Sequence, residues 1–225
     1  MDKLCITGQQ KLSGEIKVSK AKNAYLPIIA AVLLNKNKVT LKNIPKLRDI
    51  STIFKLLTNL GVEITQENNL TILNAEKITS FEAVYELVKT MRASILVLGP
   101  LLTRFKQAKV SLPGGCAIGA RPIDLHLKNL EKMGAKISLG NGYVEAVTDG
   151  LVGANLVLDF PSVGATENLL MAATLAEGKT TIENAAREPE IDDLIDFLVA
   201  MGAKIEGRGT SILIIEGTKE LRPVE

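Results

Sequence analysis

The chain has 225 residues, 46% hydrophobic and 23% charged, which is enough to build the core of one large or two small domains. Its 27 Lys and Arg are balanced by 25 Asp and Glu, and only 4% of residues are aromatic, which excludes a basic nucleic-acid-binding stripe. Two cysteines and one histidine exclude a disulfide scaffold and argue against a structural zinc site. The start lacks the apolar run of a signal peptide, and the apolar stretches are too short to span a bilayer. These features predict a soluble cytoplasmic protein.

The N-terminal residues Leu4–Val18 alternate loosely between apolar and polar side chains around Gly8 and Gly14. Such alternation predicts a pair of strands. The segment does not match the pattern that repeats along the rest of the chain. We therefore expect it to lie outside the repeating unit.

Three later segments, Asn23–Leu34, Arg92–Thr103 and Ala165–Ala176, are apolar nearly all round. Segments of this kind predict helices that are buried on every side. Each leads through a turn into a short strand, and these strands are Val39–Leu41, Val110–Leu112 and Thr181–Glu183.

Three octets match one another: Leu57–Ile64, Leu130–Ile137 and Leu198–Ile205. In each, an amphipathic helix ends at a glycine, where a left-handed residue closes the helix, and two short strands joined by a polar turn follow. The unit is strand–helix–strand–helix–strand–strand and recurs about every seventy residues. Three units predict an α/β fold with three helices inside a ring of sheets and the amphipathic helices covering the outside. The tail Thr218–Glu225 is polar, contains Pro223 and is typical of a linker.

A glycine-rich loop with a cysteine lies between a strand and a helix in Val110–His126. Cys116 follows Pro113-Gly114-Gly115, and Arg121 comes five residues later. Glycines let a ligand approach the backbone, and a guanidinium stabilises a thiolate and binds phosphate. Cys116 could instead be an inert core residue, but its polar and glycine neighbours favour a reactive or ligand-facing thiol.

The N-terminal ends of the three buried helices carry polar or small residues, Lys22-Asn23, Arg92 and Ser162–Thr166. Unpaired N–H groups and the helix dipole make such ends suitable for anions. Each cation taken alone is more often a solvated surface charge. Together with Arg121, they predict a site for a phosphorylated or sugar-nucleotide substrate.

These residues fall in longer motifs that resemble the UDP-N-acetylglucosamine 1-carboxyvinyltransferase family of enolpyruvyl transferases. The motifs are A-K-N-A at 21–24, V-K-T-M-R-A-S at 88–94, S-L-P-G-G-C-A-I-G-A-R-P-I-D-L-H at 111–126, S-V-G-A-T at 162–166 and E-N-A-A-R-E-P-E-I at 183–191. The resemblance covers essentially the whole chain. It implies an inside-out α/β barrel domain of three βαβαββ repeats.

The resemblance implies transfer of the enolpyruvyl group of phosphoenolpyruvate to the 3′-hydroxyl of UDP-N-acetylglucosamine, with release of phosphate, as peptidoglycan synthesis begins. Cys116 would be the general acid and the target of fosfomycin, and no cofactor or metal is implied. The implied substrate-binding residues are Lys22, Asn23, Arg92, Arg121, Pro122, Ile123, Asp124, Leu125, Ser162, Val163 and Gly164.

Members of the family have two such domains, and the resemblance implies that this chain is the Cys-loop domain. Residues 1–21 would belong to the absent second domain and residues 22–225 would form the catalytic repeat domain. In the family the second domain normally supplies the aspartate that takes the hydroxyl proton, so we expect negligible turnover by this chain alone and possible self-association. Lys20 stands where the family usually has glycine. The alternatives are the sister 5-enolpyruvylshikimate-3-phosphate synthase and a non-catalytic sugar-nucleotide-binding or assembly module.

Overall fold

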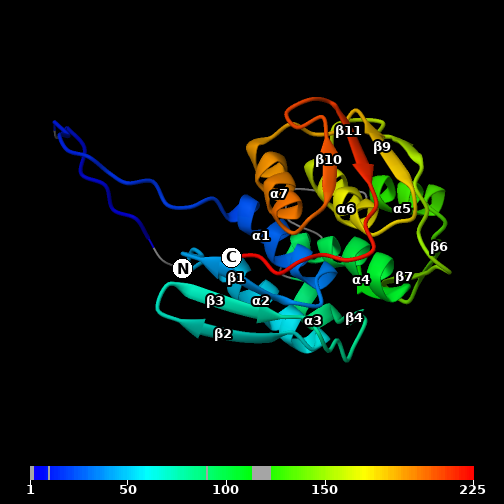
Figure 1. Ribbon diagram of the computed structural model, residues 1–225. Coiled ribbons are helices and arrows are strands. Elements are labelled where there is room, and N and C mark those ends of the chain that lie inside the picture. Colours follow the sequence, from blue (N-terminus) through cyan, green and yellow to red (C-terminus); the bar gives the residue numbers. More distant parts are fainter. Residues whose placement is uncertain (1–2, 10, 90, 113–122) are drawn as a thin grey trace.

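Three buried helical segments lie at the centre of the computed structural model, which describes residues 3–9, 11–89, 91–112 and 123–225 (Figure 1). They are α1 (Lys22–Ala31) with η1 (Val32–Leu34), η2 (Arg92–Val97) with α4 (Leu98–Phe105), and α6 (Val163–Thr174). The segments pack against one another, which confirms the burial that their apolar sequences predicted. Within the described residues, no helix combines the length and the apolar character needed to cross a membrane.

In the described part of the chain, three sheets surround these helices. The first contains β1 (Lys38–Lys42), β2 (Glu63–Glu67) and β3 (Leu70–Asn74) in the order β1-β3-β2. The second contains β4 (Glu82–Ala83), β5 (Gln107–Ser111), β6 (Lys136–Gly140) and β7 (Tyr143–Val147) in the order β4-β5-β7-β6. The third contains β8 (Asn155–Val157), β9 (Lys179–Glu183), β10 (Lys204–Glu206) and β11 (Ile212–Glu216) in the order β10-β11-β9-β8. Strand β4 pairs in parallel with β5, as β8 does with β9, and the other strand pairs are antiparallel.

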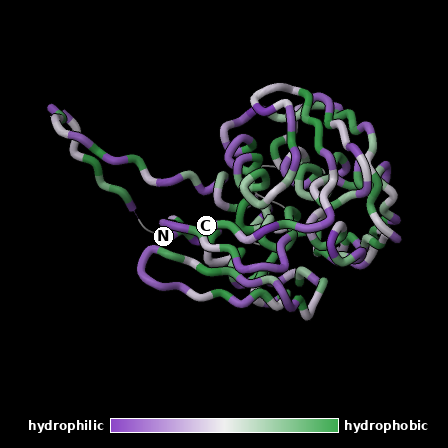
Figure 2. The backbone as a smooth tube through the Cα atoms, viewed as in Figure 1, coloured by the Kyte–Doolittle hydropathy of each residue, from purple (hydrophilic) through white to green (hydrophobic). Residues whose placement is uncertain are grey.

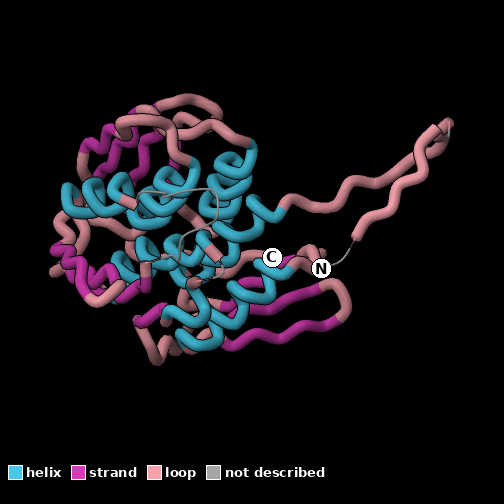
Figure 3. The backbone as a smooth tube through the Cα atoms, turned by 180° about the vertical axis from the view of Figure 1, so that it is seen from behind, coloured by secondary structure: helices cyan, strands magenta, loops and turns pink. Residues whose placement is uncertain are grey.

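The amphipathic helices are α2 (Arg48–Leu60), α5 (Asp124–Lys132) and α7 (Pro189–Ala200), and a short helix α3 (Tyr85–Val88) precedes η2. Helices α2 and α7 pack against α1, and α5 packs against α6. Each of these helices buries one face on the central helices and leaves the other to solvent, as at Lys55 of α2, Lys128 of α5 and Val199 of α7, so the predicted outer position is confirmed. The sheets complete the periphery (Figure 3). The strands also have one face on the core and one in solvent, as in β1, which buries Val39 and Leu41 and leaves charged Lys38 and Lys42 to solvent.

A glycine follows each of the three amphipathic helices, as predicted. Gly61 closes α2 in the left-handed conformation with φ of 110°, and Gly134 and Gly202 take φ of 96° and 106° after α5 and α7. At Gly61 an added Cβ would also lie 2.7 Å from the backbone nitrogen of Thr79. This position therefore requires glycine both for its backbone conformation and for the close approach of the following chain.

The N-terminal arm, residues 3–9 and 11–21, projects away from the repeats (Figure 1). Its apolar side chains Leu4, Ile6, Leu12, Ile16 and Val18 are 87–95% exposed. Figure 2 shows hydrophobic and hydrophilic stretches following one another along the arm. No strand is assigned to the described residues of this arm, so the predicted strand pair is wrong. An isolated pair of strands buries too little apolar surface to be stable in water.

The C-terminal tail packs on the first sheet, so its interpretation as a linker is wrong. Val224 forms a parallel bridge to Val39, and the Thr40 N–H donates to the Val224 carbonyl at 3.0 Å. Leu221 is only 5% exposed. The tail thus occupies, beside β1, the place that β4 holds beside β5 and β8 holds beside β9. The first repeat receives its parallel partner from the far end of the chain, which is why local composition did not reveal it.

Candidate active site

The start of η2 and the N-terminal ends of α5 and α6 meet around His126. This residue lies in the first turn of α5 and is 6% exposed. A Cβ on Gly164, in the first turn of α6, would lie 3.6 Å from the imidazole Cε1 and 3.8 Å from Nε2. The structure therefore brings together three of the predicted substrate-binding segments, those at Arg92, 123–125 and 162–164.

The first turn of α6 is prepared for an anion. The Ser162 hydroxyl caps the helix by accepting from the Ala165 N–H at 3.4 Å. Residues Val163 and Gly164 begin the helix, where backbone N–H groups have no acceptor within the helix itself. These N–H groups and the positive end of the helix dipole attract negative charge.

His126 is neutral at physiological pH. Burial lowers the pKa of its imidazole to about 4, and the positive charge of Arg92 acts in the same direction while Asp124 opposes both. The sequence analysis placed Asp124 and Leu125 in the site but did not single out His126. His126 is the one histidine in the chain and the last residue of the Cys-loop motif, and these two facts could have identified it from the sequence.

Lys22 and Asn23 begin α1, which packs against both η2 and α6. The Lys22 ammonium lies 2.8 Å from a carboxylate oxygen of Asp49, in the first turn of α2. The two side chains are 45% and 30% exposed, and ion pairs at such positions contribute less than about 1 kcal/mol. Separation of Lys22 from Asp49 therefore costs little.

Lys20 lies outside α1 and is exposed, with its ammonium 3.4 Å from the Tyr25 hydroxyl. That hydroxyl also donates to the Lys42 carbonyl at 3.2 Å, so Lys20 is directed toward β1. Cys116, Arg121 and Pro122 lie outside the described residues.

Glu167 is a buried acid next to this site that the sequence analysis missed. It follows the first turn of α6 and is 5% exposed. Burial, together with the charges of Glu190 and Glu188 near the start of α7, raises the pKa of its carboxyl to about 8. The folded protein therefore holds a proton on Glu167 at neutral pH.

Replacing Glu167 with glutamine is expected to change how stability depends on pH. Between the ordinary carboxyl pKa of 4.5 and the folded value of about 8, the unfolded chain loses this proton and the folded chain keeps it. Stability therefore falls as pH rises through this window, by an amount on the order of 4 kcal/mol, and levels off above it. Glu167→Gln removes this decline, which urea unfolding at pH 5 and pH 8.5 measures.

Glu177→Gln is the control, because Glu177 is exposed beyond the end of α6. It makes the same substitution at an exposed position and is expected to keep the decline of the parent protein. A Glu167→Gln protein that lost as much stability as the parent between pH 5 and pH 8.5 would contradict the assignment.

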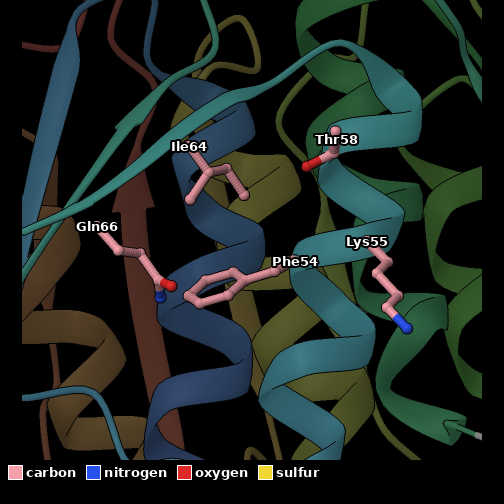
Figure 4. A pocket seen from close by; sticks show the side chains of 5 residues that line it. All are labelled: Phe54, Lys55, Thr58, Ile64 and Gln66. Carbon is pink, nitrogen blue, oxygen red and sulfur yellow. The ribbon is translucent and has the colours of Figure 1, made fainter.

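A pocket of 390 Å³ lies elsewhere, between α2 and β2. Figure 4 shows Phe54 reaching from α2 toward Ile64 and Gln66 of β2. Lys55 and Thr58 complete its lining, and none of the predicted site residues is among these five. Among the described residues, no group of three or more His, Cys, Asp or Glu side chains is arranged to hold a metal ion.

Comparison with known proteins places this geometry in a family. The model for EPSP synthase (3-phosphoshikimate 1-carboxyvinyltransferase) matches residues 6–225. A UDP-N-acetylglucosamine 1-carboxyvinyltransferase from Thermodesulfovibrio yellowstonii is 59% identical over 223 residues, which are 99% of this chain and 53% of that protein. One from Acinetobacter baylyi is 55% identical over 226 residues, 100% of this chain and 54% of that protein. The chain thus spans about half the length of the curated relatives it matches.

Solved structures share the fold. The enolpyruvyl transferase NikO from Streptomyces tendae matches with a TM-score of 0.82 and 23% identity, over 96% of this chain and 52% of that chain. EPSP synthase from Acinetobacter baumannii matches with a TM-score of 0.73 and 20% identity, over 94% and 48%. These matches confirm the predicted enolpyruvyl transferase-like α/β fold. With a family model that matches nearly its whole length, the chain belongs to the EPSP synthase family of enolpyruvyl transferases.

Proposed function

We propose that this chain is the cysteine-bearing half of an enzyme that transfers the enolpyruvyl group of phosphoenolpyruvate to the 3′-hydroxyl of UDP-N-acetylglucosamine and releases phosphate. This step begins peptidoglycan synthesis. The observation that carries the proposal is the meeting of Arg92, His126 and the first turn of α6, an arrangement suited to a diphosphate. Curated relatives named for this reaction are 55–59% identical over the full chain.

The site residues divide between the two substrates. Lys22 and Arg121 bind phosphoenolpyruvate, and Asn23 contacts substrate beside them. The sugar nucleotide is held by Arg92, by residues 121–125 and by Ser162, Val163 and Gly164. The tetrahedral intermediate carries a carboxylate and a phosphate, which positive groups fixed in advance stabilise.

Cys116 supplies the proton. Its thiol gives this proton to the methylene carbon of phosphoenolpyruvate while the sugar hydroxyl adds to the neighbouring carbon and loses its own proton to the aspartate of the second domain. Loss of one proton from the new methyl group and departure of phosphate then give the enolpyruvyl ether. A thiol suits this role because its ordinary pKa near 8.5 lies close enough to neutral to be tuned. A reducing cytoplasm keeps such a thiol free.

The remainder of the active site comes from a second domain. Residues 1–21 pack with that domain in our proposal, while residues 22–225 form the catalytic repeat domain. The exposed apolar side chains of the arm support this division. Leu, Ile and Val side chains at alternate, water-exposed positions are typical of a strand that pairs with a sheet of another domain. The same exposure favours self-association of the chain when it is alone.

The proposed activity is tested by producing this chain together with the remaining half of the Thermodesulfovibrio yellowstonii relative. We expect phosphate release that requires both phosphoenolpyruvate and UDP-N-acetylglucosamine, and negligible release by the chain alone. Release with 3-phosphoshikimate in place of the sugar nucleotide would assign the sister reaction instead. Binding of UDP-N-acetylglucosamine without turnover by the paired halves would favour a non-catalytic module.

A further inference from the structure

Asn168, a buried asparagine on α6, forms hydrogen bonds to the segment η2–α4 at the point where its 3₁₀-helix passes into an α-helix. Segment η2 is a 3₁₀-helix, and it passes into α4 at Leu98, whose N–H donates to the Ile95 carbonyl. The next N–H, that of Gly99, donates to the Asn168 Oδ1 at 2.7 Å. The Asn168 Nδ2 in turn donates to the Ile95 carbonyl at 3.2 Å. The side chain thus completes the hydrogen bonding at this junction.

The close approach of α6 depends on Gly99. A Cβ at this position would lie 2.4 Å from the Asn168 Oδ1 and 2.5 Å from its carbonyl oxygen. Both Asn168 and the junction are fully buried. The amide is therefore held in one place by packing as well as by its hydrogen bonds.

Two backbone groups fix which way the amide faces. A flipped amide would point its NH₂ at the Gly99 N–H and its oxygen at the Ile95 carbonyl, and both contacts would be repulsive. In the orientation observed, one amide hydrogen goes to Ile95 and the other faces the Nδ1 of His126 at 3.0 Å. Nδ1 must therefore accept, and the single proton of the neutral ring is on Nε2.

The Nε2 edge of the ring lies beside Gly164, in the first turn of α6. Arg92 on η2 and Asp124 on α5 are the charged groups that act on the ring from the neighbouring elements. The imidazole thus presents an N–H donor, without a positive charge of its own, where the helix N-terminus favours anions.

We propose that Asn168 is a positioning residue, which holds His126 as the Nε2–H tautomer so that its imidazole donates a hydrogen bond to a phosphate oxygen of the ligand at the first turn of α6. The tautomer follows from contacts within the chain, and the hydrogen bond to the ligand rests on the proposed function. Asn168 itself does not touch the ligand.

The tautomer can be measured directly because the chain has one histidine. In a chain labelled with ¹⁵N-histidine, long-range proton–nitrogen correlation at pH 7 shows which ring nitrogen bears the proton. We expect a protonated Nε2 and an unprotonated Nδ1. A protonated Nδ1, averaging between the two tautomers, or an imidazolium would overturn the proposal.

Asn168→Asp is the informative variant. The carboxylate still accepts from the Gly99 N–H and the Ile95 carbonyl still accepts from the Leu98 N–H, but the bond from the Asn168 Nδ2 to the Ile95 carbonyl is lost. The second carboxylate oxygen now faces Nδ1 and can only accept, so we expect the proton to move to Nδ1. The spectrum of the unmodified chain tests the tautomer even where this variant does not fold.

The matched control is Asn129→Asp, the same change on α5. The Asn129 side chain is buried and donates to the Leu125 carbonyl, not to His126. We expect this variant to keep the proton on Nε2. A switch to Nδ1 in both variants would show that any nearby charge suffices, and the role of Asn168 would be lost.

Titration with UDP-N-acetylglucosamine separates this inference from the proposed function. We expect the Nε2–H resonance to move downfield on binding, and Asn168→Asp to bind about tenfold more weakly, as the loss of a hydrogen bond to a charged group predicts. Binding that leaves the His126 resonances unchanged would overturn the donor role. Failure of the unmodified chain to bind would contradict the proposed function while the tautomer result stood.

Discussion

Removal of residues 219–225 is expected to lower the free energy of unfolding by about 6 kcal/mol. The Asn35 side chain donates to the Arg222 carbonyl at 2.8 Å, and the Asn37 side chain donates to the Leu221 carbonyl at 2.9 Å. The Arg222 N–H donates to the Met201 carbonyl at 2.8 Å. With the bond from Thr40 to Val224, these hydrogen bonds contribute about 1 kcal/mol each, and burial of Leu221 adds about 2 kcal/mol.

Part of this loss comes from the groups that remain. Asn35 is fully buried in the intact chain, and its amide would lose its acceptor at Arg222. The ion pairs Lys36–Glu220 and Lys42–Glu225 also disappear, but they are exposed and contribute little. Strand β1 would be left as an open edge.

Urea unfolding measures the loss, and removal of residues 1–18 is the control. The arm is exposed along its described length, so its removal is expected to change the free energy of unfolding by less than about 0.5 kcal/mol. Equal stability of the two shortened chains would show that the tail does not complete the first sheet.

The second large effect is expected at Cys116. In the enzyme assembled from this chain and a second half, Cys116→Ser is expected to lower the rate of phosphate release by about 10²- to 10⁴-fold, the range typical of a lost general acid. A hydroxyl is nearly isosteric with the thiol but far less acidic. The affinity for UDP-N-acetylglucosamine is expected to change by less than about threefold, since the sugar nucleotide is held by other groups.

Phosphate release and titration calorimetry on the same preparations separate these two quantities. Cys5→Ser is the matched control, because Cys5 is exposed on the arm and has no proposed role in the chemistry. We expect it to keep the parent rate. A Cys116→Ser enzyme that retained more than a tenth of the parent rate would exclude the thiol as the general acid.

Features that depend on neighbours in the sequence were predicted well. The apolar segments gave the three central helices, and the matching octets gave the glycines that end α2, α5 and α7. Helix periodicity and left-handed caps are set within a few residues, so a local pattern is enough to reveal them.

Features that depend on distant partners were not predicted. Asn168 binds Gly99 and Ile95, which are 69 and 73 positions away, and Asn35 binds Arg222 across 187 positions. Nothing in the local sequence of the tail distinguishes a strand that joins β1 from a polar linker.

The site was predicted in part. The resemblance gave Arg92, residues 123–125 and residues 162–164, and the structure brings these segments together around His126. The resemblance did not identify Asn168 or Glu167. A single polar residue in an apolar helix has no distinguishing sequence pattern, and its role follows only from the groups that surround it in the fold.

The most direct test of the account is a titration of the ¹⁵N-labelled chain with UDP-N-acetylglucosamine, followed through its backbone amide resonances. The account predicts that the largest shifts occur at Arg92, at residues 123–126 and at residues 162–164, where the start of η2 and the ends of α5 and α6 meet. Shifts centred instead on the pocket between α2 and β2, or no shifts at millimolar ligand, would contradict it.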